Sequence, residues 1–296
     1  MRYFRLVLIL LLLWSGFMLA QQAQGPFDEY GEVLKAQLSS APFPHARRAA
    51  GHSYGKEFFS AEEHYADSSV ACFIPRGFRP TDSVDLIIHI HGWWNNIDTV
   101  LRRYLLPQQV AESGKNAILV VPEGPRNAPD SFGGKLEDQD GLKRFVGDVV
   151  DFLYAQGRIK TRALGKLILA GHSGAYHAIS YALLQGGITE HIREVYLFDA
   201  LYGQVEKYTH WIDHYNGKMV VMYTDSGGTK DETEGLMEDL RAWNIPYFAA
   251  EETSASPADV SNHRLIFLHT DLSHDMVLHG RMEFREFLKA SCLSNR

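Results

Sequence analysis

Short apolar runs alternate along the chain with longer segments whose apolar residues recur every three or four positions. Seven runs predict strands because they are almost continuously apolar and end at a turn or polar residue; they cover residues 70–74, 85–92, 117–121, 166–170, 195–198, 219–223 and 265–268. Helical spacing or good helix formers mark three longer segments, at residues 141–154, 175–184 and 232–243. Strands without a polar face, separated by amphipathic helices, predict an α/β fold with a mostly parallel sheet covered by helices on both faces.

The N-terminal residues have a different pattern. Arg2 and Arg5 precede an apolar stretch that runs to Ala20, and a glutamine-rich segment follows it. This layout predicts a signal peptide over residues 1–20, cleaved between positions 20 and 25, and therefore an exported protein that is periplasmic or secreted. The alternative is an uncleaved membrane anchor, because the apolar run is close to the ~17 residues that span a bilayer.

The rest of the chain has no proline- or serine-rich linker and no repeat, so residues 26–296 are predicted to form one domain. Residues 27–64 fit an N-terminal strand, a pocket cover or a flexible arm, and their pattern does not choose among them.

Charge and cysteine content narrow the class of partner. The chain has 29 basic and 36 acidic side chains and a formal net charge of −7, which disfavours nucleic acid and, after signal cleavage, a membrane surface. Cys72 and Cys292 allow either one disulfide or two free thiols. His89 and His91 lie on one face of a predicted strand but lack a third ligand at suitable spacing, so we predict no metal and no cofactor.

Candidate chemistry gathers where the predicted strands end. The fourth strand runs directly into Gly171-His172-Ser173-Gly174-Ala175, the strand, turn and helix arrangement that lifts a serine hydroxyl above a sheet edge. Such an elbow is usually written G-x-S-x-G, because strand and helix must approach closely on either side of the serine. Ala175 departs from this pattern by one methyl group, so the sequence predicts Ser173 as a nucleophile.

A serine hydroxyl needs a base within hydrogen-bond reach and a carboxylate that orients the base. His274 lies in a loop beyond the last strand and can reach back over the sheet, whereas His269 adjoins that strand. We therefore prefer His274 as the base. Asp199 is the preferred acid because it follows a strand directly and is flanked by apolar residues, and Asp225, beyond the next strand, remains the alternative.

Acyl transfer also needs backbone N–H groups aimed at the developing oxyanion. Gly92 lets the chain turn tightly after an early strand, so the Trp93 N–H is predicted to form an oxyanion hole together with the N–H of Gly174. Weaker candidates for pocket residues are Glu123, Arg126, Asp130, Tyr176, His177 and Tyr202.

In this order along the chain, His91-Gly92-Trp93, the Ser173 elbow, Asp199 and His274 resemble the α/β-hydrolase superfamily over about residues 70–288. The resemblance implies the α/β-hydrolase fold, with a central sheet of about eight strands. It also implies a Ser173, His274 and Asp199 triad with an oxyanion hole from Trp93 and Gly174. The expected activity is hydrolysis of a small-molecule, glycan or peptide carboxylic ester through an acyl-enzyme; a serine peptidase or amidase, or a silent envelope binding protein, is the alternative.

Overall fold

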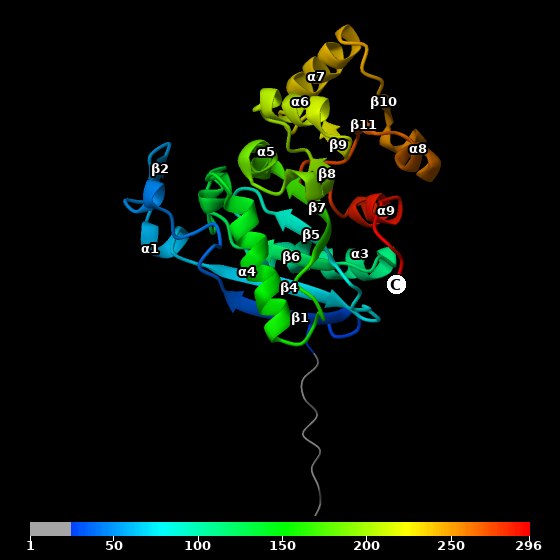
Figure 1. The fold of residues 1–296 in the computed structure, drawn as a ribbon. Helices are drawn as coiled ribbons and strands as arrows, with labels where there is room; N and C mark the ends of the chain where they lie inside the picture. The colour runs from blue at the N-terminus through cyan, green and yellow to red at the C-terminus, as the bar shows by residue number, and fades with distance from the viewer. Residues whose placement is uncertain (1–24) are drawn as a thin grey trace, which may run out of the picture.

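Within residues 25–296, which this computed structural model describes, nine strands form one central sheet (Figure 1). Their order across the sheet is β1-β4-β6-β5-β7-β8-β9-β11-β10. β4 is antiparallel to both of its neighbours, and all other neighbouring strands are parallel. The bounds are β1 (Gly31–Gln37), β4 (Ser69–Pro75), β5 (Val84–Ile90), β6 (Ile118–Pro122), β7 (Leu164–His172), β8 (Ile192–Phe198), β9 (Lys218–Thr224), β10 (Phe248–Glu251) and β11 (Leu265–Thr270).

All seven strands predicted from apolar runs are present, as β4, β5, β6, β7, β8, β9 and β11. The α/β fold with a mostly parallel sheet is therefore confirmed. The sheet has nine strands rather than about eight, because two edge strands escape the apolar pattern. Half-buried and exposed positions largely alternate in β1 and β10, as is usual where one face of a strand meets solvent.

Helices cover both faces of the sheet, as predicted. One face carries α4 (Gly141–Ala155), α5 (Tyr176–Gln185), α6 (Val205–His214) and α7 (Lys230–Ala242). The other carries α2 (Ile97–Arg103), α3 (Leu106–Ser113), α8 (Pro257–Asn262) and α9 (Glu283–Lys289). A large buried apolar cluster lies on each face, and each fully buried aliphatic or aromatic side chain stabilises the fold by roughly 1.5–3 kcal/mol. Two packed layers thus hold the strand ends in place.

The segment before β4 forms an edge strand and a separate hairpin. β1 pairs with β4, while β2 (His52–Tyr54) and β3 (Glu57–Phe59) pair only with each other and precede α1 (Ala61–His64). In Figure 1 β2 and α1 lie together at one side of the molecule. Phe43 and Phe59 pack with Tyr65 and Phe132 in a third buried cluster, so this segment is anchored on the loop after β6.

The strand order creates a crevice at the carboxyl edge of the sheet. β5 lies between β6 and β7; the chain leaves β5 toward β6 but leaves β7 toward β8. The two loops therefore depart in opposite directions, and such switch points are where α/β sheets bind ligands. Gly92 and Ser173 stand near the starts of these loops.

The two cysteines do not form a disulfide. Cys72 is buried in β4, Cys292 is exposed near the C-terminus, and both are free thiols. Among the helices of residues 25–296, none has the length and apolarity needed to cross a bilayer. The predicted signal peptide lies outside the described residues.

Candidate active site

Ser173 stands at a sharp turn between β7 and α5. It opens a single turn of 3-10 helix, Ser173–Ala175, and its φ of 55° lies in the left-handed region. A Cβ at Gly171 would lie 2.6 Å from the Ala175 Cβ, so strand and helix approach too closely for two side chains there. Glycine before and alanine after the serine satisfy this packing, and the predicted elbow is present.

The loop after β5 meets this elbow. A Cβ at Gly92 would lie 2.6 Å from the Ser173 Cβ and 2.7 Å from the His172 carbonyl oxygen, so only glycine permits the approach. A Cβ at Gly174 would lie 2.6 Å from Cδ1 of Trp93. Within residues 25–296 the Trp93 backbone N–H donates no hydrogen bond. Both predicted oxyanion-hole residues therefore lie beside Ser173.

His91 and Glu123 fix the conformation of this loop. His91 Nδ1 lies 2.9 Å from the Gly92 carbonyl oxygen, and the Gly124 N–H donates to Nε2 at 2.9 Å. A Glu123 carboxylate oxygen lies 3.0 Å from the same Nε2. Glu123, one of the weaker pocket candidates, is only 3% exposed and holds the buried histidine that shapes the loop.

His274 and Asp199 meet across the ends of two strands. Nδ1 of His274 lies 2.7 Å from a carboxylate oxygen of Asp199. Asp199 is fully buried and also accepts hydrogen bonds from the Thr224 and Thr229 hydroxyls. Burial opposes ionisation of this group, but the hydrogen bonds from His274 and Thr229 hold the pKa of Asp199 below its usual range. An ionised Asp199 keeps the Nδ1 proton on His274 and leaves Nε2 free to accept a proton.

Asp225, the alternative acid, lies elsewhere. It is exposed and forms ion pairs with Lys230 at 2.6 Å and with His269 Nε2 at 3.2 Å. His269 also contacts Glu251 at 3.0 Å; burial alone would lower the pKa of His269, but the two carboxylates raise it overall. Asp225 and His269 thus pair with each other and not with His274.

The Ser173 side chain lies near a tyrosine. Burial raises the pKa of Tyr202 to about 12, while its interaction with Ser173 acts in the opposite direction. The Tyr202 hydroxyl donates to the Gly227 carbonyl oxygen at 2.5 Å. Among residues 25–296 no hydrogen bond joins Ser173 Oγ to His274; such contacts are often long in free enzymes and shorten when substrate binds.

Most of the other pocket candidates make structural contacts. Asp130 forms an ion pair with Arg48 at 2.6 Å, and Arg126 lies 3.5 Å from Asp67. His177 pairs with Glu137 at 2.7 Å. These ion pairs account for the charged groups of the three residues, and Asp130 also lines a small hollow together with Gly174.

Exposed aromatic rings lie beside the Gly92 loop. The Trp93 ring is 5.1 Å from that of Tyr54 in the β2–β3 hairpin, and the Trp94 ring is 5.5 Å from that of Phe59. Tyr54, Phe58 and Trp94 are 49%, 64% and 53% exposed. An apolar surface of this kind next to a site usually contacts a ligand.

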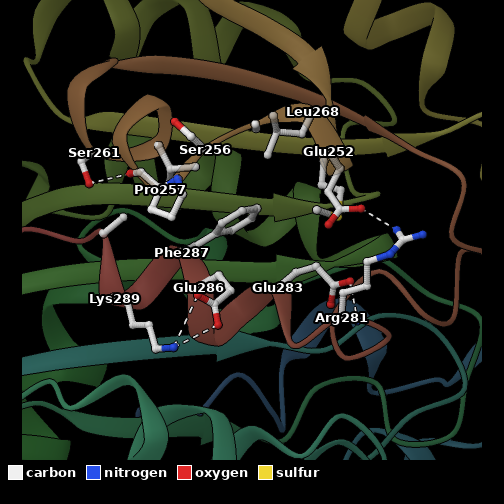
Figure 2. A pocket seen from close by; sticks show the side chains of 14 residues that line it. Glu252, Ser256, Pro257, Ser261, Leu268, Arg281, Glu283, Glu286, Phe287 and Lys289 are labelled. Carbon is white, nitrogen blue, oxygen red and sulfur yellow. Dashed lines mark hydrogen bonds and ion pairs between the residues drawn. The ribbon is translucent and has the colours of Figure 1, made fainter.

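A separate hollow of about 290 Å³ lies among β9, β11, α8 and α9 (Figure 2). Apolar side chains such as Leu268 and Phe287 line part of it, and Arg281 pairs with Glu252 at its rim. Ser173 and His274 do not line it. The hollow is therefore distinct from the candidate site, although Arg281 belongs to the loop that carries His274.

The sequence pattern does not mark the two threonines that bind Asp199. Thr224 ends β9 and Thr229 precedes α7, and isolated threonines at such places usually cap or terminate elements. Nor does the sequence pattern indicate a role for His172. Within residues 25–296 no cluster of three or more histidine, cysteine or carboxylate side chains could hold a metal ion.

No protein-family model matches the chain, and no curated protein matches it either. Solved structures do resemble it. The fluorophosphonate-binding serine hydrolase FphF of Staphylococcus aureus aligns with a TM-score of 0.51 and 11% identity over 88% of this chain and 97% of that one. S-formylglutathione hydrolase FrmB of Staphylococcus aureus has a TM-score of 0.53 and 11% identity over 87% and 96%.

A ferulic acid esterase aligns with a TM-score of 0.51 and 13% identity over 75% of this chain and 91% of that chain. At such low identity these likenesses establish the fold. The chain therefore has the α/β-hydrolase fold.

Proposed function

We propose that this protein is an exported serine hydrolase that cleaves a carboxylic ester through an acyl-enzyme intermediate. One observation carries the proposal: His274 Nδ1 lies 2.7 Å from the buried Asp199, at the sheet edge where Ser173 stands. A buried carboxylate that orients a half-exposed histidine near a strained serine is the arrangement that activates a serine hydroxyl.

The proposed reaction uses each group in turn. Ser173 Oγ attacks the ester carbonyl carbon and transfers its proton to His274 Nε2, while the Trp93 and Gly174 N–H groups stabilise the oxyanion. His274 then gives that proton to the departing alcohol. A water molecule, deprotonated by His274, attacks the acyl-enzyme and releases the carboxylic acid and free Ser173. This cycle needs no cofactor.

The structural neighbours named above are esterases and hydrolases, which supports an ester over an amide as the substrate. The exposed rings near Trp93 support a substrate with a flat acyl or alcohol group. Export through the predicted signal peptide remains part of the proposal, with a periplasmic or secreted location.

Labelling of the purified protein with a fluorophosphonate probe tests the proposal. We expect wild-type protein to be labelled, and Ser173→Ala and His274→Ala to lose labelling while remaining folded by circular dichroism. His269→Ala is the matched control and keeps its labelling. A folded wild-type protein that the probe does not label would contradict the proposal and favour a catalytically silent binding protein.

A screen of soluble aryl esters and matched aryl amides then distinguishes esterase from amidase activity. We expect turnover of the esters only. Faster turnover of the amides would assign the site to a peptidase or amidase.

A further inference from the structure

His172 is the last residue of β7 and precedes Ser173 directly. It is only 2% exposed. Its ring lies between those of Tyr104 and His274, with centroid separations of 5.4 Å and 4.6 Å. The residue therefore lies behind the candidate base, away from the open side of the site, and the mechanism above assigns it no step.

The partners of His172 define which nitrogen carries its proton. Nε2 lies 2.8 Å from the main-chain oxygen of His274. A carbonyl oxygen only accepts, so the proton must be on Nε2. Nδ1 lies 3.5 Å from the Tyr104 hydroxyl, which can donate to it. Burial, and after it the neighbouring His274, lowers the pKa of His172 to about 4, so the ring is neutral near pH 7 and donates only through Nε2.

This hydrogen bond holds a part of His274 that Asp199 does not hold. Asp199 binds the imidazole at Nδ1, which orients the ring but does not hold the main chain of His274 itself. The segment of residues 271–282 has no helix or strand. The bond from His172 anchors the carbonyl of the same residue, and its donor is covalently attached to Ser173. Nucleophile and base are thereby tied together through one side chain.

We propose that His172 is a positioning residue, whose Nε2–H holds the main chain of His274 so that its imidazole stays within reach of Ser173 Oγ. The proposal rests on the proposed function, because it concerns the geometry of that catalytic pair. A misplacement of about 1 Å between reacting groups can reduce the rate on the order of 10²-fold.

Two variants test this role with a soluble aryl ester. His172→Phe keeps a ring of similar size and removes the donor; His172→Gln places an amide N–H near the former Nε2. We expect His172→Phe to lower kcat on the order of 10²-fold with KM unchanged within about twofold. His172→Gln should recover most of kcat. Rates are expressed per folded protein, measured by circular dichroism, so that a loss of folded material does not count as a loss of kcat.

Tyr104→Phe is the control, because it removes the partner of Nδ1 and leaves the Nε2 bond in place. We expect its kcat to stay within about threefold of wild type. If His172→Phe does not fold, His172→Asn replaces it, since its shorter amide cannot reach the His274 carbonyl, and the same loss of kcat is expected.

Full kcat in a folded variant that lacks the donor would overturn the proposal. So would an equal loss in His172→Gln and His172→Phe. Failure of the proposed function has a different signature: wild-type protein would then have no esterase activity and no Ser173-dependent labelling.

Discussion

Two residues of the site have a positive φ, a backbone conformation that residues other than glycine seldom adopt. φ is 55° at Ser173 and 45° at Asp199, and each such conformation costs about 1–3 kcal/mol. The surrounding contacts offset this cost: Thr224 and Thr229 bind the Asp199 carboxylate, and the Tyr176 N–H binds the Ser173 carbonyl oxygen. The strain therefore coincides with the proposed nucleophile and acid, where rigid placement serves the chemistry.

If Asp199 is the catalytic acid, replacing Asp199 should lower kcat strongly, whereas replacing Asp225 should not. Asp199→Asn should lower kcat on the order of 10³ to 10⁴-fold, because an amide no longer holds the Nδ1 proton on His274. Asp225→Asn should change kcat by no more than about threefold, since Asp225 is exposed and pairs with Lys230. Steady-state ester hydrolysis measures both. A large loss in Asp225→Asn alone would reassign the acid.

The absence of a side chain at Gly92 lets the loop after β5 approach Ser173, so a methyl group at this position should reduce activity. Gly92→Ala places a Cβ 2.6 Å from that of Ser173, which displaces the loop that carries the Trp93 N–H. We expect the rate of fluorophosphonate labelling to fall on the order of 10²-fold.

Gly147→Ala is the control for this substitution. Gly147 lies within α4, and nothing lies within 4 Å of an added Cβ. It should keep the labelling rate and raise the free energy of unfolding by up to about 1 kcal/mol. An unchanged labelling rate in Gly92→Ala would show that this loop does not form the oxyanion hole.

At the scale of elements, the segment that carries His274 is held by side chains at both ends. Arg281 binds Asp271 at 2.6 Å and also contacts Glu252 and Thr270. Gln109 of α3 donates to the Leu278 carbonyl oxygen at 2.8 Å. These tethers add to the backbone hydrogen bonds of the turns in this segment, so the position of the base depends on β11, α3 and the turn after β10 together.

Loss of Arg281 should loosen this segment. In Arg281→Met we expect amide hydrogen exchange in residues 271–282 to become about fivefold faster, which corresponds to about 1 kcal/mol for a partly exposed ion-pair network. Arg285→Met is the control: it removes an equal charge, but Arg285 pairs with Glu112 and Glu286. Equal amide exchange rates in residues 271–282 of the two variants would show that Arg281 does not hold this segment.

At the scale of the whole molecule, stability rests on two apolar layers around the sheet, and one carboxyl group is buried at the edge of such a layer. Glu283 of α9 is 2% exposed and accepts from the Arg281 N–H at 2.7 Å. Within the described residues its other oxygen has no hydrogen-bond partner. Burial raises the pKa of Glu283 to about 7. The Glu283 carboxyl group therefore holds its proton more tightly in the folded chain than in the unfolded chain.

This shift predicts how stability depends on pH. The unfolded chain releases the Glu283 proton near its ordinary pKa of 4.5, but the folded chain releases it near 7, so stability falls between these values as pH rises. The loss is complete above pH 7 and amounts to roughly 3 kcal/mol. Urea unfolding at pH 5 and pH 8 should show Glu283→Gln to be stabilised relative to wild type at pH 8 only.

Glu286→Gln is the control for that measurement. Burial of Glu286 opposes ionisation, but Arg285 and Lys289 hold its pKa below the usual range. Its neutral replacement should therefore lose stability at pH 8 and not gain it. A gain in both variants would attribute the effect to net charge and not to burial of Glu283.

The sequence by itself determined the fold class, and it predicted two residues of the candidate site. Continuous apolar runs predicted seven strands because buried parallel strands have no polar face. The elbow predicted Ser173, since glycine and alanine must flank a turn where strand and helix nearly touch. His274 followed from the requirement that a base extend from a loop past the last strand. These inferences depend on the spacing of residues near one another along the chain, which can be read directly from the sequence.

Only the tertiary structure decided which acid meets the base. Asp199 and His274 are 75 positions apart, and both aspartates follow neighbouring strands, so the choice depends on the directions in which the side chains leave the sheet. The bond from His172 to His274 spans 102 positions, and Glu123 reaches His91 across 32. Spacing along the chain carries no information on such contacts, because packing of the two helical layers sets them.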